Sequence, residues 1–131
     1  MGIEEYVVPG KILYLSVCFP HEEEYHNKYF VVVGISNNPF LLKINSRKVK
    51  EHEFCLRQSI YTFLEYDSYL DCSTVWYGLI TIEEIINQLT SDRTRIKGEI
   101  QEFHKSEIVR LVRLSRSISP IHKQIIIEAM M

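Results

Sequence analysis

Three apolar segments in the first third of the chain place the strongest constraint on its fold. Residues Lys11–Phe19, Lys28–Ser36 and Phe40–Ser46 are rich in β-branched and aromatic side chains and are bounded by turn-forming residues, which is typical of β-strands. The short connection Asn37-Asn38-Pro39 joins the second segment to the third and predicts a hairpin. The near-continuous hydrophobicity of the first segment indicates burial on both faces. The segments therefore predict three adjacent antiparallel strands.

Shorter β candidates follow this region. A polar loop at residues 47–53 precedes Phe54–Arg57 and Tyr66–Cys72, which both carry β-forming side chains. Five or six short strands with long loops are typical of a small antiparallel β-barrel rather than an open α/β sheet. The length of 131 residues suits one such core and is too short for two ordinary ones.

The remaining third of the chain predicts helices. Thr81 and Glu84 have the spacing of a capping box, and the helix that begins there carries an apolar stripe that we expect to be buried, made of Ile82, Ile85, Ile86 and Leu89. A second helical pattern runs from about Arg95 to Leu114. Ser119-Pro120 opens a third, because serine caps helices and proline suits the first helical position.

We therefore expect one domain in two parts. Residues 1–91 form the barrel with its first helix, and residues 92–131 form a helical extension that packs on the barrel or on a partner. The net charge of −2 is unevenly divided between the parts: the first carries 7 basic and 12 acidic side chains and the second carries 8 basic and 5 acidic. A mildly basic extension on an acidic body suits either an anionic partner or a solvated helix face.

Cellular location and redox state follow from composition. The first residues lack the basic and apolar regions of a signal peptide, and no apolar run is long enough to span a membrane, so we predict a cytoplasmic protein with no membrane partner. The cysteines at positions 18, 55 and 72 are odd in number and widely spaced, which fits neither a disulfide framework nor a zinc site. They are expected to be reduced and mostly buried.

Several enzyme classes lack their signatures here. The chain has no glycine-rich phosphate loop, no dinucleotide fingerprint, no G-x-S-x-G elbow and no H-E-x-x-H motif. His21, Glu22, Glu24 and His26 carry metal-ligating groups, but without further spaced ligands they are more simply surface residues of a loop. The prediction is that the protein uses no metal and no cofactor.

Polar residues near the strand ends form the candidate site. We expect them to converge at one end of the barrel, and they are His21, His26, Lys28, Asn45, Ser46, Arg47, Asp67, Tyr69 and Asp71. Asp67 and Asp71 are four residues apart, so they share a face of a continuous strand, either as a catalytic carboxylate and its support or as turn-capping acids.

The order and spacing of motifs over residues 9–90 resemble the PemK/MazF family of toxin ribonucleases. The pattern includes a cation seven residues after His21 that opens an apolar strand, and a hydroxyl residue after the third strand. Its segments, in order, are Pro9-Gly10-Lys11-Ile12, His21-Glu22, Lys28, Ile35-Ser36, Ser46, Tyr66–Asp71 and Gly78–Leu89.

This resemblance implies a closed SH3-like barrel, commonly dimeric, that cleaves single-stranded RNA without metal and is silenced by a cognate antitoxin protein. Cleavage needs a base for the 2′-hydroxyl and cations for the phosphorane. The catalytic and RNA-binding candidates follow these needs: His21 or Asp71 as base, Lys28 or Arg47 on the phosphate, Ser46 as its hydrogen-bonding partner, and His26, Tyr69 and Asp67 along the RNA.

The chain departs from the family pattern at the cation. Lys28-Tyr29 stands where family members usually have Arg-Pro, and lysine cannot offer the bidentate fork that arginine gives to phosphate. An alternative function therefore stays open, namely a non-catalytic barrel that binds protein or nucleic acid, as a module or within a prokaryotic or phage defence assembly.

Overall fold

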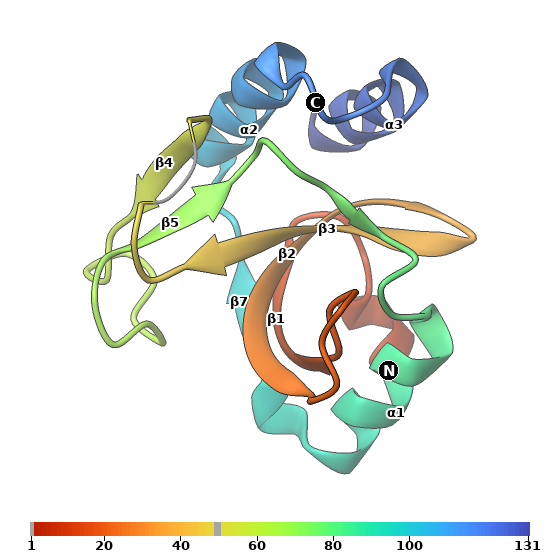
Figure 1. Cartoon of the computed structure of the whole chain (residues 1–131). Coiled ribbons are helices and arrows are strands. Elements are labelled where there is room, and N and C mark those ends of the chain that lie inside the picture. Colours follow the sequence, from red (N-terminus) through yellow and green to blue (C-terminus); the bar gives the residue numbers. More distant parts are fainter. Residues whose placement is uncertain (1, 49–50) are drawn as a thin grey trace.

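The computed structural model describes residues 2–48 and 51–131 and shows a curled antiparallel sheet flanked by helices (Figure 1). In this part of the chain seven strands form the sheet in the order β4-β5-β3-β2-β1-β7, and β6 pairs with β3. The elements are η1 (Ile3–Tyr6), β1 (Lys11–Val17), β2 (His26–Ser36), β3 (Asn38–Asn45), β4 (Glu53–Leu56), β5 (Ser68–Asp71), β6 (Trp76–Tyr77), α1 (Ile82–Ser91), η2 (Arg93–Arg95), β7 (Ile96–Glu99), α2 (Glu102–Leu114) and α3 (Pro120–Met130).

The predicted small, bent antiparallel β fold is confirmed at this level of detail. The three strands expected in the first third of the chain are β1, β2 and β3, and they pair in sequence order. The polar loop expected at residues 47–53 contains Val49 and Lys50, which lie outside the described residues.

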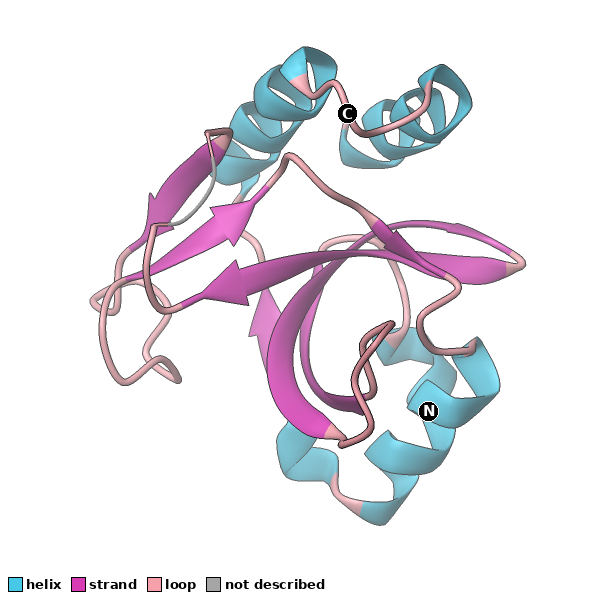
Figure 2. Ribbon diagram, viewed as in Figure 1, coloured by secondary structure: helices cyan, strands magenta, loops and turns pink. Residues whose placement is uncertain are grey.

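Strands β1 to β3 are apolar on both faces because each face covers a separate core. On β2, Val31 and Val33 belong to the core that includes residues of α2 and α3, whereas Phe30 and Val32 belong to the core that includes residues of α1. All four side chains are fully buried. Figure 2 shows the corresponding arrangement, with α1 on one side of the curled sheet and α2 and α3 on the other. Because successive side chains of a strand point to opposite faces, β2 contributes side chains to both cores.

Two small features shape the β2–β3 hairpin. Asn37 turns the chain with a φ of 68°, a left-handed conformation that asparagine tolerates, and Ser36 pairs with Asn38 across the turn. Gly34 lies against α3, where an added Cβ would come within 3.2 Å of Ile125 Cγ2. A side chain at position 34 would require the Ile125 side chain to move by a few tenths of an ångström.

Helix α1 begins as the sequence predicts. The Thr81 hydroxyl oxygen accepts the Glu84 backbone N–H at 3.1 Å, and the Glu84 carboxylate accepts the Thr81 backbone N–H at 3.2 Å, which completes the capping box. Within the predicted stripe Ile85 and Leu89 are fully buried, while the two other isoleucines are half-buried against the same core. The helix therefore closes one side of the sheet.

The second predicted helix begins later than its pattern indicated. Residues 96–99 form β7, which pairs antiparallel with β1, and α2 begins only at Glu102. Through this pairing the backbone groups along the outer side of β1 gain hydrogen-bond partners on β7. An ion pair also joins the two strands, with Lys11 Nζ 3.1 Å from Glu99 Oε2. Residues after position 91 thus extend the sheet itself. Helix α3 begins after Ser119, whose hydroxyl accepts the His122 backbone N–H at 3.3 Å as a cap.

The cysteines are all free thiols, but only Cys72 is buried. Burial raises the pKa of the Cys72 thiol well above its ordinary value, with nearby Asp71, Glu107 and Glu53 acting in the same direction. Cys18 and Cys55 are partly exposed, so the expectation that most cysteines are buried is wrong. Among the described helices none combines the length and the apolar character needed to cross a bilayer.

The α1 core gives the first testable prediction. Replacing Ile85 with Ala removes a fully buried side chain between α1 and the sheet, so the free energy of unfolding should fall by about 2–4 kcal/mol in urea denaturation. Asn87→Ala, on the exposed face of the same helix, is the control and should change it by no more than about 0.5 kcal/mol. Equal effects for the two variants would show that the stripe does not stabilise the fold.

Candidate functional site

A pocket of about 410 Å³ opens where β1, β2 and β3 meet the loop of residues 57–67. The surrounding side chains are mostly polar, aromatic or charged. They are Tyr14, Asn27, Lys28, Tyr29, Ile44, Asn45, Ser46, Arg47, Leu64, Glu65, Tyr66 and Ser68. Four residues predicted from sequence to converge at the site therefore share one pocket, namely Lys28, Asn45, Ser46 and Arg47.

Strand register explains this meeting of distant residues. Phe30 pairs with Lys43 in the antiparallel β2–β3 ladder, so two residues further along Lys28 comes level with Asn45. Ser46 and Arg47 follow directly as β3 ends, and both are exposed, as is Lys28. The ammonium and the guanidinium are thus free to face an anionic ligand at the pocket mouth.

Aromatic rings form a wall of the pocket. The Tyr14 and Tyr29 rings lie with their centroids 4.5 Å apart, and Phe63 lies 5.3 Å from Tyr29. Tyr66 lines the same pocket with 53% of its surface exposed. Burial raises the pKa of the Tyr29 hydroxyl, and nearby Tyr14 and Glu65 raise it further, so this hydroxyl stays protonated at neutral pH.

Two more cations reach the site from the C-terminal part of the chain. The Arg95 guanidinium carbon lies 5.8 Å from the centroid of the Tyr14 ring, and Lys97 Nζ lies 5.7 Å from it. Arg95 also donates hydrogen bonds of 2.9 Å to the Tyr14 carbonyl and to Asn27 Oδ1. We call Lys28, Arg47, Arg95 and Lys97 the basic rim. No sequence motif marked Arg95 and Lys97 as site residues, although the positive charge of residues 92–131 was a signal for them.

The loop of residues 57–67 supplies Leu64, Glu65 and Tyr66, and hydrogen bonds hold both of its ends. Asp67 Oδ1 accepts the Gln58 backbone N–H at 2.8 Å, and Ser68 Oγ donates to the Tyr66 carbonyl at 3.0 Å. Asp67, predicted to lie along the RNA, is thus outside the pocket lining and closes the loop instead.

The middle of this loop is fixed by Tyr61. Its hydroxyl accepts the Gln101 backbone N–H at 3.0 Å and lies 2.6 Å from His104 Nδ1. The hydroxyl and His104 Nδ1 share a hydrogen bond whose donor depends on the tautomer of the imidazole. The start of α2 is therefore tied to the wall of the pocket.

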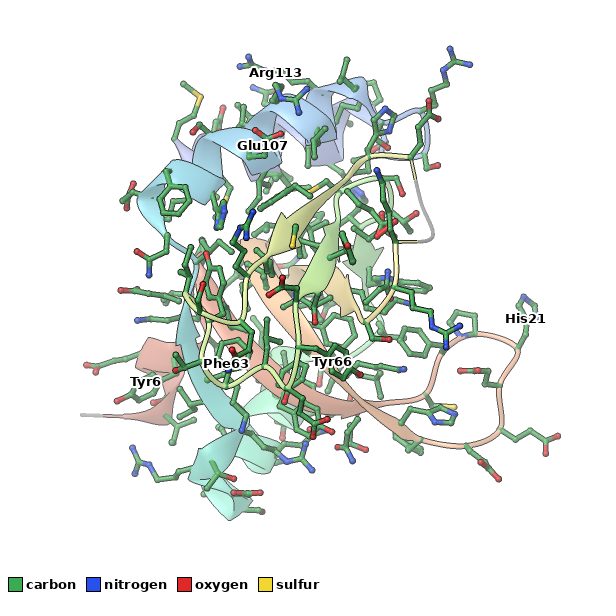
Figure 3. The ribbon with its side chains drawn as sticks, turned by 90° about the vertical axis from the view of Figure 1, so that its left-hand side faces the viewer. Tyr6, His21, Phe63, Tyr66, Glu107 and Arg113 are labelled. Atoms are coloured by element: carbon green, nitrogen blue, oxygen red, sulfur yellow. The ribbon has the colours of Figure 1, made fainter. Side chains whose placement is uncertain are left out.

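The other predicted site residues lie elsewhere. His21 is exposed at a turn in the β1–β2 connection, and Figure 3 shows it far to one side of Tyr66. His26 is exposed at the start of β2, where it pairs with Val17 of β1, and it does not line the pocket. Asp71 is buried at the far end of β5, where its Oδ1 accepts hydrogen bonds from the Ser73 backbone N–H at 2.9 Å and from the Ser73 hydroxyl at 2.5 Å.

Tyr69 also falls outside the lining, half-buried on β5 between its partners Asn45 and Cys55. The carboxylate that does line the pocket is Glu65, which the sequence analysis did not single out. No motif marked it, because the loop that carries it is placed by the Tyr61 contacts. Among the described residues no three His, Cys, Asp or Glu side chains gather as metal ligands. The pocket thus offers donors, cations, aromatic rings and one carboxylate.

The Tyr61–His104 contact predicts a pH dependence of stability. Burial lowers the pKa of His104 below its ordinary value of 6.5, with Glu107 opposing the shift, so the unfolded chain takes up the proton first as the pH falls. The contribution of neutral His104 to the free energy of unfolding is fully present above pH 6.5 and is lost as the pH falls through the lowered pKa. Urea denaturation from pH 7.5 to 5 should show a steeper loss for wild type than for His104→Gln. The exposed control His26→Gln should keep the wild-type slope, and a wild-type slope in His104→Gln would refute the assignment.

Comparison with known proteins assigns no family. No protein-family model matches the chain, and no curated protein matches it. The PemK/MazF resemblance of residues 9–90 is therefore carried by the motifs of the sequence alone.

Proposed function

We propose that the pocket binds single-stranded RNA, on a barrel of the PemK/MazF type. The observation that carries this proposal is that Lys28, Arg47 and three tyrosines line one pocket, and that Arg95 and Lys97 lie over the ring of one of these tyrosines, Tyr14. Unpaired bases stack on aromatic rings, and the phosphates between them are neutralised by lysine and arginine. The combination suits a flexible strand with alternating flat bases and charged linkers.

The distribution of charge supports an anionic ligand at this place. The chain as a whole has a net charge of −2, so a general attraction for nucleic acid is not expected. The lining of the pocket, however, holds two cations, Lys28 and Arg47, and one carboxylate, Glu65, and Arg95 and Lys97 add two cations at the Tyr14 ring. A local positive region of this kind attracts phosphate even when the distant surface is acidic, because screening limits the reach of distant charges to about 10 Å.

RNA cleavage is a second candidate, and Glu65 is the observation that favours it. In the proposed step the Glu65 carboxylate takes the proton of a 2′-hydroxyl, the 2′-oxygen attacks the adjacent phosphorus, and the bond to the 5′-oxygen breaks. Lys28 protonates the leaving oxygen, and Arg47 balances the negative charge of the phosphorane. The products are a 2′,3′-cyclic phosphate and a 5′-hydroxyl. A cognate antitoxin and a homodimer belong to this candidate through the family resemblance.

Binding is tested by fluorescence anisotropy with a labelled single-stranded RNA. Lys28→Ala and Arg47→Ala should each weaken binding and lower the slope of log affinity against log salt by about 0.7, the value for one phosphate contact on a single strand. Arg116→Ala removes an equal charge from the exposed connection between α2 and α3 and should leave both quantities unchanged. Equal losses in all three variants would mean that binding is a general charge effect and not a property of the pocket.

Cleavage is tested separately with purified protein in EDTA. If the second candidate is right, wild type should cut single-stranded RNA, and Glu65→Gln should lose at least about 100-fold in rate while its affinity for RNA is kept. Asp71→Asn, which alters a buried carboxylate outside the pocket, is the matched control. Intact RNA after incubation with wild type would leave the binding function without the catalytic one.

A further inference from the structure

A groove of about 670 Å³ runs between α2 and the end of α3. Its lining comes from one face of α2 and from the last two residues of the chain, Met130 and Met131. None of the lining residues belongs to the pocket at the ends of β1 to β3, and Figure 3 shows Arg113 of α2 well apart from Tyr66. The groove is therefore a separate site with its own chemistry.

The groove exposes apolar side chains to water. Val109 and Met130 are buried in its lining, whereas Leu114 is 53% exposed and Met131 is 85% exposed. Exposed apolar side chains that gather around a hollow mark an interaction surface, unlike single ones scattered over a protein. Methionine side chains are flexible and adapt to the shape of a partner. The lining thus suits an apolar occupant.

The shape of the groove follows α2. The residues of α2 in the lining are spaced three or four apart, from Ser106 to Leu114, and therefore share one helix face. Phe103, which is 59% exposed, lies one turn earlier on the same face. From Phe103 to Leu114 this face runs for about 16 Å. An elongated occupant of about three helical turns matches this length.

The charge of the groove favours an acidic occupant. Its lining contains two cations, Arg110 and Arg113, and no acidic side chain. Arg110 is paired with Glu107, but within the described residues no carboxylate lies in ion-pair contact with the Arg113 guanidinium. Residues 92–131 as a whole carry 8 basic and 5 acidic side chains. Acidic side chains beside the apolar face of an occupant would complement this charge.

A second copy of this chain offers no such occupant in the part that the structure describes. Its acidic amphipathic helix is α1, with Glu83 and Glu84 in the first turn, but α1 buries Ile85 and Leu89 in its own core. The sequence of α2 has three basic and two acidic side chains, and that of α3 has one of each. Neither helix is acidic, so the occupant comes from another protein.

We propose that the groove between α2 and α3 binds an amphipathic α-helix of a partner protein, apolar on one face and acidic along its edges. The apolar face of the partner covers Leu114 and Met131, and its carboxylates meet Arg110 and Arg113. This is the helix-in-groove mode of recognition, in which apolar side chains three or four residues apart anchor the bound helix. The proposal is independent of RNA binding, because the two sites share no lining residue.

The experiment measures the binding of labelled model helices by fluorescence anisotropy. The test peptide has about 14 residues, with leucines three and four positions apart and glutamates beside them. One control peptide has lysine in place of every glutamate, and the other has serine in place of every leucine. The net charge of the protein, −2, favours the lysine peptide, so a preference for the glutamate peptide reports the local charge of the groove.

Two variants change the groove and two change exposed residues outside it. Leu114→Glu and Arg113→Glu alter the lining, whereas Ile121→Glu and Arg116→Glu make the same changes elsewhere on the helical extension. All four side chains are exposed, so we expect each variant to keep the fold.

Wild type should bind the glutamate peptide at least about 10-fold more tightly than either control peptide. Leu114→Glu should weaken this binding at least about 10-fold, because a charge replaces an apolar contact. Arg113→Glu should weaken it about 5-fold and should improve binding of the lysine peptide. The affinities of Ile121→Glu and Arg116→Glu should stay within about 2-fold of wild type.

Three results would overturn the proposal: no binding of the glutamate peptide to wild type at about 100 μM, equal affinity for the three peptides, or equal losses in all four variants. Two other occupants are tested with the same proteins. Sedimentation with phosphatidylglycerol vesicles that is lost only in Leu114→Glu would assign the surface to a membrane. A dimer in analytical ultracentrifugation that is lost only in Leu114→Glu would assign it to a second copy. Either result would replace the partner helix.

Discussion

The burial of β1, β2 and β3 on both faces is the constraint on which the other features depend. A sheet that is apolar on both sides must be covered twice, and this chain covers it with α1 on one side and α2 and α3 on the other (Figure 1). Polar side chains are thereby kept mostly to the strand ends, although Lys43 of β3 pairs with the buried Phe30. On β2 the first three residues are exposed and the five from Phe30 to Gly34 are buried. The ends of these strands are left for polar groups, and the pocket lies at such an end.

The wall opposite the strands depends on a different kind of interaction. A loop of eleven or so residues has considerable conformational freedom, and ordering it only when a ligand binds would weaken affinity. Here Tyr61 is almost fully buried and bonded to the start of α2, while Asp67 fixes the end of the loop. Glu65 and Tyr66 are therefore held before any ligand arrives. Because burial lowers the pKa of His104, which contacts Tyr61, this order is sensitive to acid.

The sequence predicted the elements whose signals are local. Apolar periodicity located β1 to β3 and the buried face of α1, and the capping box located its first residue. The apolar pattern placed the start of the second helix too early. Residues 96–99 pair with the edge of β1 instead, and no local pattern encodes this long-range interaction. The same limit applies to the site. Lys28, Ser46 and Arg47 stand at strand ends and follow from the register, whereas Glu65 depends on a loop whose position is set by Tyr61.

Arg95 and Lys97 show why residues 92–131 belong to the site as well as to the fold. β7 is added to the sheet beside β1, and this pairing brings both cations over the Tyr14 ring. The acidic balance of the first 91 residues would otherwise leave Lys28 and Arg47 as the main positive charges at the pocket. Cations near an aromatic face can contact the phosphates on either side of a stacked base. The strand that completes the sheet therefore also adds positive charge beside the pocket, which the proposed nucleic-acid ligand would require.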